Sequence, residues 1–484
     1  MVNGTNYGGN EEALLNEKGS IVYAYILACV AAVGGLLFGY DIGVISGAID
    51  FVKINFELNE HWEGFTAACA MIGCIFGALL AGILSDKYGR KKVLIGTAFL
   101  YALSALWSAL PHSWAELVLA RFVGGLAVGI SAMVSPMYIA EISPARIRGR
   151  LVAINQLAIV CGMNLSYIAN WLLVNVGQPE CPSAVMTALD NRLRSWFGFD
   201  GDTNWRWMFG AEAIPSIALF FGLFFVPESP RWLTKQGWAE RALRILARIG
   251  GRQHAREEME EIQLTLAMEE EKGSVFQLLK PGLRTVLFIG IALAILQQIS
   301  GANTVLFYAP KIFQKIGYQE SESAFWNTVL VGTTFVICTL IALAVIDKMG
   351  RKPLLMIGAA GMSLSLVLMG LLPRYESISD KWTLAAILAY IALYAVSLAP
   401  VVWVLLSEIF PTDIRGRAMS IATFGLWVSC YAVTQTFPYL WARFGENTFL
   451  GYAAICAFAF FFVAYIVKET KGKTLEEIER SWKR

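Results

Sequence analysis

Residues 86–92 read DKYGRKK, and residues 347–353 read DKMGRKP. A second pair of motifs follows at a similar spacing, because AEISPARIRGR at 140–150 matches SEIFPTDIRGR at 407–417. Two motifs that recur in the same order indicate that one half of the chain repeats the other. We therefore expect two copies of one structural unit, each carrying both motifs at equivalent positions.

Apolar segments of membrane-spanning length surround these motifs. The chain has 484 residues, of which 56% are hydrophobic and 16% are charged, and its mean hydropathy is +0.55. Soluble proteins carry roughly 25% charged residues, and a helix needs about 20 apolar residues to cross a membrane. The segments of this length are 21–46, 62–84, 92–110, 114–138, 149–176, 205–226, 284–309, 323–346, 353–372, 382–406, 415–440 and 447–467. They predict an all-α polytopic membrane protein with 12 transmembrane helices in two six-helix halves.

The loops that hold the repeated motifs are rich in lysine and arginine. By the positive-inside rule these loops face the cytoplasm of a cell membrane, and an even number of spans places both termini there. The expected divisions are a cytoplasmic tail at 1–20, a bundle at 21–226, a linker at 227–283, a second bundle at 284–467 and a cytoplasmic tail at 468–484. Apolar residues recur at helical spacing within the charged linker, which favours short amphipathic helices over the alternative of a solvated linker.

Several functional classes are disfavoured by composition. The net charge of +2 gives no basis for nucleic-acid binding. The chain has three histidines, no HExxH motif and no CxxC pair, so we expect neither a metal nor a cofactor. No set of nucleophile and base stands out, so an enzyme is not expected.

The stretch QQISGAN at 297–303 places amides inside an apolar segment. Unpaired amides cost free energy in the membrane. On an ideal helix Gln298 and Asn303 stand about 140° apart, but Gly301 permits a break that would turn both toward one cavity. We expect a polar solute to bond them there. The alternative is that they bond only to neighbouring helices.

The chain resembles the sugar porter family of the major facilitator superfamily, in particular its bacterial proton symporters of xylose and hexoses. The resemblance rests on GGLLFGYD (34–41), RFVGGLAVG (121–129), PESPRWL (227–233), QQISGAN, VVWVLLSEIFP (401–411) and KETKGKTLEEIE (468–479). It implies the major facilitator fold and secondary active import of a monosaccharide, such as xylose, glucose, galactose or arabinose, with a proton. The alternatives are a passive facilitator of a sugar or a polyol such as inositol, and a non-transporting sugar sensor. The partners are then the sugar, protons and membrane lipid, and the chain is expected to act as a monomer.

The same resemblance implies which residues bind the sugar. Amides suit hydroxyls because each can donate and accept a hydrogen bond, and aromatic rings pack against the apolar faces of sugars. The implied amides are Gln156, Gln297, Gln298 and Asn303, the implied rings are Phe38, Trp403 and Trp427, and Tyr308 is implied to help close the outer side. Phe335, Leu426 and Met163 stand where family members carry polar residues, which leaves the identity of the sugar open.

Charged residues inside the apolar segments suggest a coupling site. Asp41 and Arg121 are expected to pair, because an isolated charge in a membrane costs several kcal/mol. We expect protonation of Asp41 to release the arginine, with Glu212 as a second acid in the network. A static structural ion pair is the alternative.

The charged residues of the repeated loops are expected to form a cytoplasmic gate. The set comprises Asp86, Arg90, Glu141, Arg148, Glu228, Arg231, Asp347, Arg351, Glu408, Arg415 and Glu469. Ion pairs among them would close the two halves and hold an outward-open state, so neutralising Arg90 and Arg351 should favour the inward-open state. The alternative is that these charges only enforce topology.

Overall fold

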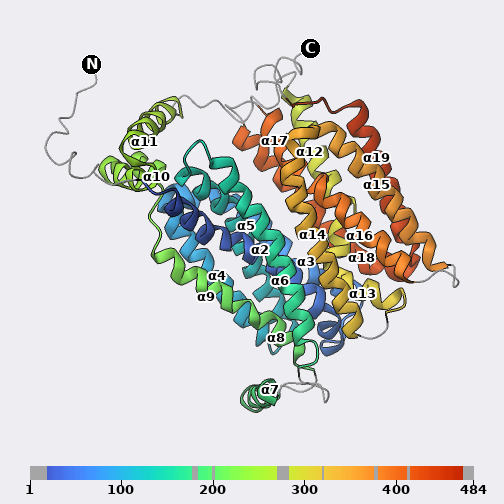
Figure 1. Cartoon of the computed structure of the whole chain (residues 1–484). Coiled ribbons are helices and arrows are strands. Elements are labelled where there is room, and N and C mark those ends of the chain that lie inside the picture. Colours follow the sequence, from blue (N-terminus) through green and yellow to red (C-terminus); the bar gives the residue numbers. More distant parts are fainter. Residues whose placement is uncertain are drawn as a thin grey trace.

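The computed structural model describes residues 19–176, 184–198, 202–269, 283–318, 321–374, 380–410 and 415–471. The expected tails therefore lie mostly outside the described residues, and so does the end of the expected linker. The described residues form two bundles of long helices, coloured blue to green and yellow to red in Figure 1.

The first bundle contains six spans. Its helices are α2 (Ile21–Asn55), α3 (Glu60–Tyr88), α4 (Arg90–Ala109), α5 (Trp114–Ile142), α6 (Arg148–Leu173), and the pair α8 (Asn204–Ala211) and α9 (Ala213–Phe224), which together make the sixth span. Polar residues cap three of the helix starts, where the first N–H groups have no partner within the helix. The side chains of Ser20, Asn59 and Ser113 accept hydrogen bonds from the backbone three residues later.

The second bundle repeats this order. Its helices are α12 (Leu283–Ile299), α13 (Ala302–Lys315), α14 (Ser321–Met349), α15 (Arg351–Leu371) with the short η2 (Leu372–Arg374), α16 (Asp380–Val396), α17 (Leu398–Ile409), α18 (Arg415–Phe444) and α19 (Asn447–Tyr465). By length and composition, 11 stretches of the described chain suffice to cross a membrane. The 30-residue α18 completes the 12 spans expected from the sequence.

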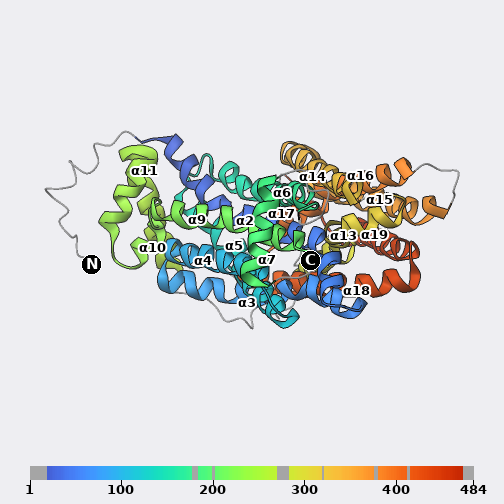
Figure 2. The same ribbon diagram turned by 90° about the horizontal axis from the view of Figure 1, so that it is seen from below.

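The two bundles lie side by side, as Figure 2 shows from below. Contacts between them are made chiefly by α3 with α18 and by α6 with α14. Because α3 and α14 are the second spans of their halves, and α6 and α18 the fifth, the two contacts are equivalent. This exchange of partners is what two repeats related by a two-fold axis produce.

The repeated motifs lie at one end of the molecule, which we call the basic face. Helices α10 (Pro230–Lys235) and α11 (Ala239–Glu269) lie at this end and pack around Trp232, Leu233 and Leu246. The N–H of Ser20 donates to the carbonyl of Arg248, and Lys471 donates to the carbonyl of Lys348. Both ends of the described chain therefore lie at the basic face, and the expected linker segment contains helices.

The opposite face carries an element that the sequence did not predict. The loop after the fifth span contains α7 (Ala184–Phe197), drawn at the bottom of Figure 1. Arg194 pairs with Asp190 at 2.7 Å within this helix. Its polar pattern and lack of an apolar run of spanning length made it look like a loop.

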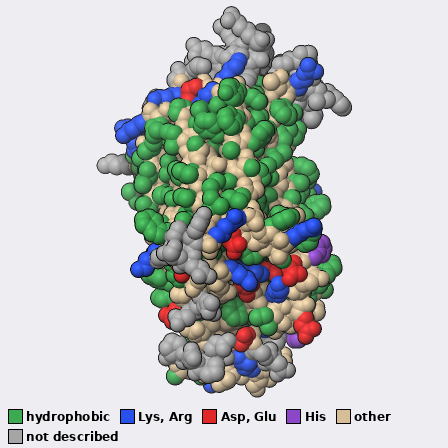
Figure 3. All heavy atoms as spheres, turned by 90° about the vertical axis from the view of Figure 1, so that its right-hand side faces the viewer, with side chains coloured by type: hydrophobic (Ala, Val, Ile, Leu, Met, Phe, Trp, Pro, Cys, Tyr) green, Lys and Arg blue, Asp and Glu red, His purple; other side chains and the backbone are tan. Residues whose placement is uncertain are grey.

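The outer surface of the bundles is apolar between the two faces. Figure 3 shows a broad belt of hydrophobic side chains, with charged side chains gathered beyond its two ends. Leu364 of α15 and Phe458 and Phe461 of α19 are each more than half exposed. An exposed apolar belt of this extent is the surface that a lipid bilayer covers. The chain is therefore a multi-pass membrane protein.

Candidate functional site

A cavity of about 410 Å³ lies between the two bundles. Both halves line it, through α2, α3, α5 and α6 on one side and α12, α13, α14, α16, α17 and α18 on the other. This volume is within the range of small-molecule sites, roughly 300–1,000 Å³. The lining is mostly apolar with a few polar groups, which is the usual composition of a site that orients a small solute.

The predicted helix break at Gly301 is confirmed. Helix α12 ends at Ile299 and α13 begins at Ala302, and Gly301 between them has φ +91°. A side chain at this position would be strained by the backbone and would also meet the ring of Tyr452. The break brings the two amides together, since Asn303 Nδ2 donates to Gln298 Oε1.

The four predicted amides all line the cavity but differ in their partners. Gln297 Nε2 donates to the carbonyls of Leu398 (2.7 Å) and Ala399 (3.1 Å) at the start of α17. It thus ties the break between α12 and α13 to the second break, between α16 and α17. On the other side of the cavity, no described residue hydrogen-bonds to the amide of Gln156. In this conformation Gln297 therefore follows the alternative of bonding to protein, whereas Gln156 is available to a solute.

Aromatic rings from both halves meet at the wall of the cavity. The ring centroids of Phe38 and Trp427 are 5.8 Å apart, and Trp403 lines the same space. Tyr308 does not line it. Its side chain is fully buried, its hydroxyl donates to the carbonyl of Thr434, and its ring lies 5.0 Å from that of Phe437. In this conformation Tyr308 connects α13 to α18.

The three apolar replacements noted in the sequence also line the cavity. Phe335 packs 6.0 Å from the ring of Tyr394, and Met163 and Leu426 lie on the two sides. Asn155, the residue before Gln156, also lines the cavity and was not predicted from the sequence. Its buried Oδ1 accepts no hydrogen bond from the described residues. Its position next to Gln156 was the only sequence feature that could have indicated it.

The predicted acid–arginine pair is present inside the first bundle. Asp41 Oδ1 accepts a hydrogen bond from Arg121 Nη1, and both side chains are 1% exposed. Arg121 Nη2 also donates to the backbone carbonyl of Asp41 at 3.3 Å. Glu212, at the junction of α8 and α9, is buried close enough to interact electrostatically with both. The three groups lie behind the cavity wall, because Phe38, Gly39 and Ile42 line the cavity and Asp41 does not.

Ion pairs join the two bundles at the opposite face. Lys311 of α13 contacts Glu63 of α3 and lies 3.4 Å from Asp50 of α2. Lys53 also contacts the fully buried Glu63, at 2.7 Å. The amide of Gln435 in α18 donates to the carbonyl of His61 at 3.0 Å. We call Asp50, Lys53, Glu63 and Lys311 the opposite-face cluster. Nothing in the sequence repeats marked these residues.

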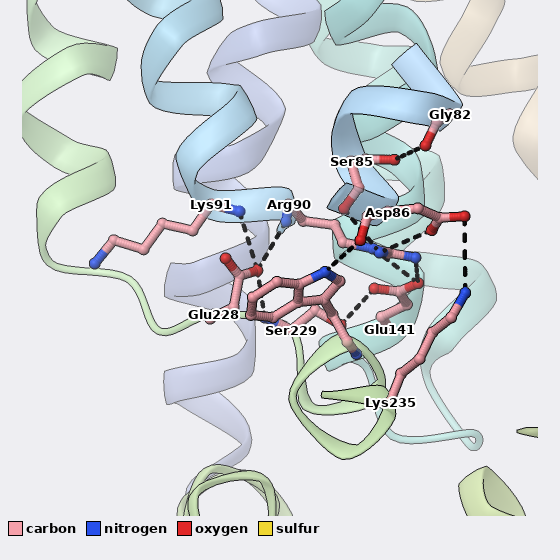
Figure 4. Close-up of polar contacts among 10 residues, drawn as sticks. Gly82, Ser85, Asp86, Arg90, Lys91, Glu141, Glu228, Ser229 and Lys235 are labelled. Carbon is pink, nitrogen blue, oxygen red and sulfur yellow. Dashed lines mark hydrogen bonds and ion pairs between the residues drawn. The ribbon is translucent and has the colours of Figure 1, made fainter. Parts of the chain in front are cut away.

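The ion pairs at the basic face join helices of the same bundle (Figure 4). Arg90 contacts Glu141 at 2.9 Å and Asp86 at 3.2 Å. The carboxylate of Glu228 accepts from the backbone N–H groups of Arg90 and Lys91, at 2.9 and 3.1 Å, and so caps α4. The arginine thereby links α3, α4 and α5, the second to fourth spans of one half.

The second bundle repeats this cluster with the corresponding residues. Arg351 contacts Glu408 at 2.8 Å, and Glu469 accepts from the backbone N–H groups of Arg351 and Lys352, at 3.1 and 3.0 Å. Gly89 and Gly350, which precede the two arginines, have φ values of +92° and +93°. The duplication seen in the sequence therefore extends to individual hydrogen bonds.

The remaining predicted gate residues lie around these clusters. Arg148 pairs with Glu258 of α11, and Arg231 lines a small pocket with both Glu141 and Glu258. The side chains of Asp347 and Arg415 lie outside the described part of the structure. The gate was expected to close one half against the other. In this conformation its described ion pairs instead act within a half or, for Arg148 and Glu258, between the first half and α11.

The cavity extends toward the basic face. Its lining includes Val152 and Met419, each about one turn from the basic-face end of its helix, and Pro136 near the end of α5. At the other end the halves are joined by the opposite-face cluster. We therefore describe this conformation as open toward the basic face.

Comparison with known proteins agrees with this architecture. The family model described as "Sugar (and other) transporter" matches residues 27–482. The arabinose-proton symporter of Bacillus subtilis is 40% identical over 464 residues, which cover 96% of each chain. The D-xylose-proton symporter of Escherichia coli is 37% identical over 501 residues, which cover 97% of each chain.

Solved structures agree as well. The inward-open conformation of the xylose transporter XylE from Escherichia coli has a TM-score of 0.80 and 36% identity, and the match covers 95% of this chain and 100% of that chain. The predicted all-helical major facilitator fold is thus confirmed. With a family match over nearly its whole length, the chain belongs to the sugar porter family of the major facilitator superfamily, a family of membrane transporters and not of enzymes.

Proposed function

We propose that this protein imports a pentose or hexose together with a proton, as a monomer in the cell membrane, by alternating access. The basic face would be cytoplasmic, following the positive-inside rule. One observation carries the proposal: Gln298 and Asn303 meet at the Gly301 break, in a cavity that both halves line. A site at the interface of two repeats, built on a broken helix, is typical of secondary transporters.

The cavity can hydrogen-bond some of the hydroxyls of a sugar but not all of them. The amides of Gln156, Gln298 and Asn303 can each bond a hydroxyl, and Phe38 and Trp427 can pack against C–H groups. Phe335 and Leu426 offer no hydrogen bonds, so the hydroxyls that point toward them would be left without partners. All of these groups belong to one chain, which supports transport by a monomer.

Proton coupling is supported by the charge balance of the buried triad. Asp41 and Glu212 could carry two negative charges against the single positive charge of Arg121. A buried excess charge is costly, so the triad is electrically neutral when one carboxyl holds a proton. Loading and unloading that proton could change which carboxyl pairs with Arg121. A proton driven by about 100 mV and one pH unit supplies roughly 3.7 kcal/mol, enough for a sugar gradient of several hundredfold.

The coupling proposal is tested in proteoliposomes with an imposed pH gradient and a panel of radiolabelled monosaccharides and polyols. We expect the wild type to accumulate at least one sugar, and Asp41→Asn to exchange that sugar without accumulating it. Uptake by the wild type that moves no protons would instead identify a passive facilitator. Binding without any flux would identify a sensor.

Recognition is tested separately by replacing Gln298 and Asn303 with leucine. Each lost hydrogen bond to a buried hydroxyl costs about 1–3 kcal/mol, so the double variant should bind the sugar at least about thirtyfold more weakly. The control is Gln236→Leu, an exposed amide at the end of α10. Unchanged affinity in the double variant would remove these two amides from the site.

A further inference from the structure

A second, larger cavity of about 720 Å³ lies at the basic face of the first bundle. It is bounded by the start of α4, the end of α9, and helices α10 and α11. Its apolar side is formed by Ile95, Phe224, Trp232, Leu233, Trp238 and Ile245. Five basic side chains line the rest, namely Lys91, Lys92, Arg241, Arg244 and Arg248. We call it the basic pocket.

The basic residues of this pocket come from two helices that face each other. Arg241, Arg244 and Arg248 are spaced by three and four positions, which places them on one side of α11. Lys91 and Lys92 lie in the first turn of α4, where the N–H groups of the helix add a partial positive charge. In Figure 4, Lys91 extends away from the ion pairs around Glu141.

One acidic residue lines the pocket, and its carboxylate is already engaged. Glu228 Oε1 accepts hydrogen bonds from the backbone N–H groups of Arg90, Lys91 and Ser229, at 2.9, 3.1 and 2.8 Å. It caps α4, and Glu240 lies 4.0 Å from Arg244, so two carboxylates offset only part of the charge of the five basic side chains. The pocket therefore presents a net positive charge next to an apolar surface.

The location of the pocket indicates what kind of anion it suits. It lies where a membrane span begins at Arg90 and another ends at Phe224, so it is at the boundary of the apolar belt. Phe224 and Trp238 are about half exposed, and tryptophan favours the membrane interface. A small soluble anion would use the basic side chains but would leave these apolar side chains exposed to water. An anionic phospholipid would cover both.

We propose that the basic pocket binds an anionic phospholipid, with the phosphate against Lys92, Arg241 and Arg244 and an acyl chain along Phe224 and Ile95. The proposal does not depend on which solute the central cavity carries. Basic pockets at the ends of transmembrane helices bind acidic headgroups by this combination of charge and apolar contact. The bound lipid would also connect α11 to the first bundle.

The test is native mass spectrometry of the full chain in detergent, titrated with phosphatidylglycerol or with phosphatidylethanolamine. Arg241→Gln combined with Arg244→Gln should weaken phosphatidylglycerol binding about twenty-fivefold, since each basic residue contributes roughly fivefold near an anionic headgroup. The matched control is Arg252→Gln combined with Arg256→Gln, two exposed arginines that follow the kink of α11 at Gly251 and do not line the pocket. This control should bind as the wild type does.

Other outcomes would overturn the proposal. If the pocket double variant and the control double variant lost the same affinity for phosphatidylglycerol, the lipid would be attracted by the overall charge of α11 and not by a defined site. If the wild type bound phosphatidylethanolamine as strongly as phosphatidylglycerol, the headgroup charge would not select the bound lipid. Displacement of phosphatidylglycerol by millimolar inorganic phosphate would assign the pocket to soluble anions. Arg241→Lys with Arg244→Lys keeps the charge and should restore most of the binding, which separates loss of the site from loss of folding.

Discussion

The opposite-face cluster and the basic-face clusters are both built from acids and bases, but they connect different parts of the molecule. Lys311 of the second half contacts Glu63 and Asp50 of the first, so the ion pairs at the opposite face cross between the halves. At the basic face Arg90 pairs with Glu141, and Arg351 with Glu408, each within its own half. In this conformation the halves are joined by charge at the closed end of the cavity and not by these pairs at its open end.

This difference separates two roles for charge in one fold. The basic-face clusters come from the duplicated motifs and hold each half together as a rigid unit. The opposite-face cluster has no counterpart in the repeats and stabilises one arrangement of the two units. A mutation at the basic face should therefore affect mainly the stability of a half, and one at the opposite face mainly the balance between conformations.

Reversing the charge of Lys311 should have the largest effect. Lys311→Glu would place three acids together, and breaking a buried pair costs about 3–5 kcal/mol. We expect the opposite face to open and sugar uptake to fall at least tenfold. The cavity also holds the native Cys430, so the labelling is done in a background with Cys430 replaced by alanine. A membrane-impermeant thiol reagent applied from that side should then label a cysteine introduced at Ala132, which lines the cavity.

The matched control is Lys315→Glu, in the last turn of the same helix, where the side chain is exposed. Its sugar uptake and its thiol labelling should match those of the protein that carries the introduced cysteine without the charge reversal. Combining Glu63→Lys with Lys311→Glu should recover part of the closure. Wild-type uptake by Lys311→Glu would show that the cluster does not hold the halves together.

Removing the two motif arginines compares the halves with each other. Arg90→Ala should lower the stability of the protein by about 3–5 kcal/mol, because it leaves a buried carboxylate unpaired. Arg351→Ala should cost less, since the side chains of Arg351 and Glu408 are 13% and 22% exposed against 8% and 9% for Arg90 and Glu141. Thermal unfolding in detergent measures the difference. The reverse order would show that the burial of these ion pairs does not set their contribution to stability.

Replacing the motif glycines Gly89 and Gly350 should lower stability less than removing Arg90, and by similar amounts in the two halves. An alanine at Gly89 or Gly350 would adopt a positive φ, and its Cβ would lie 2.3 or 2.9 Å from a carboxylate oxygen of Glu228 or Glu469. We expect each change to destabilise by about 1–3 kcal/mol. The control is Gly96→Ala in α4, where no heavy atom lies within 4 Å. That change should be neutral or stabilising, and equal losses at all three positions would refute the steric argument.

The smallest effect concerns the pH dependence of one basic-face carboxylate. Burial favours a higher pKa for Glu469, but the backbone N–H groups of Lys471, Arg351, Lys352 and Thr470 outweigh it and hold the pKa below its ordinary value of 4.5. A carboxyl with a lowered pKa stabilises the folded state above its unfolded pKa. That contribution is lost as the pH falls through the folded value.

Glu469→Gln should therefore reduce stability near neutral pH by less than about 1 kcal/mol, because this group is largely screened by solvent. The variant and the wild type should converge as the pH falls through the folded pKa, which lies below 4.5. The measurement is thermal unfolding as a function of pH, with the exposed Glu260→Gln of α11 as control. A difference that persists unchanged in acid would show that the carboxylate charge is not responsible.

Much of the fold followed from local sequence patterns. Apolar length predicted the spans, the repeated motifs predicted the halves, and Gly301 predicted the break that brings Gln298 and Asn303 together. Of the eight residues expected to bind the sugar, seven line the cavity, and Tyr308 lies outside it. Residues such as Phe38 and Trp427 came from the family resemblance, because a lone aromatic residue in a span has no local signature of a site.

Other features depended on contacts that no local pattern records. Lys311 and Glu63 are 248 positions apart and meet only because α13 packs against α2 near the start of α3 in this conformation. The anchoring of Gln297 on the carbonyls of Leu398 and Ala399 likewise depends on a second helix break about 100 positions away. The helix α7 was missed because a short polar helix has no apolar run of spanning length.

By itself the sequence determined which segments enter the membrane, how the two halves correspond and where the polar groups of each span lie. These properties are local, since hydrophobic length and glycine conformation act on neighbouring residues. The tertiary structure alone decided which of those polar groups come into contact. It also decided at which end of the molecule the two halves are joined. That choice depends on how helices distant in sequence cross, and an ion pair forms only where two charges come within a few ångströms.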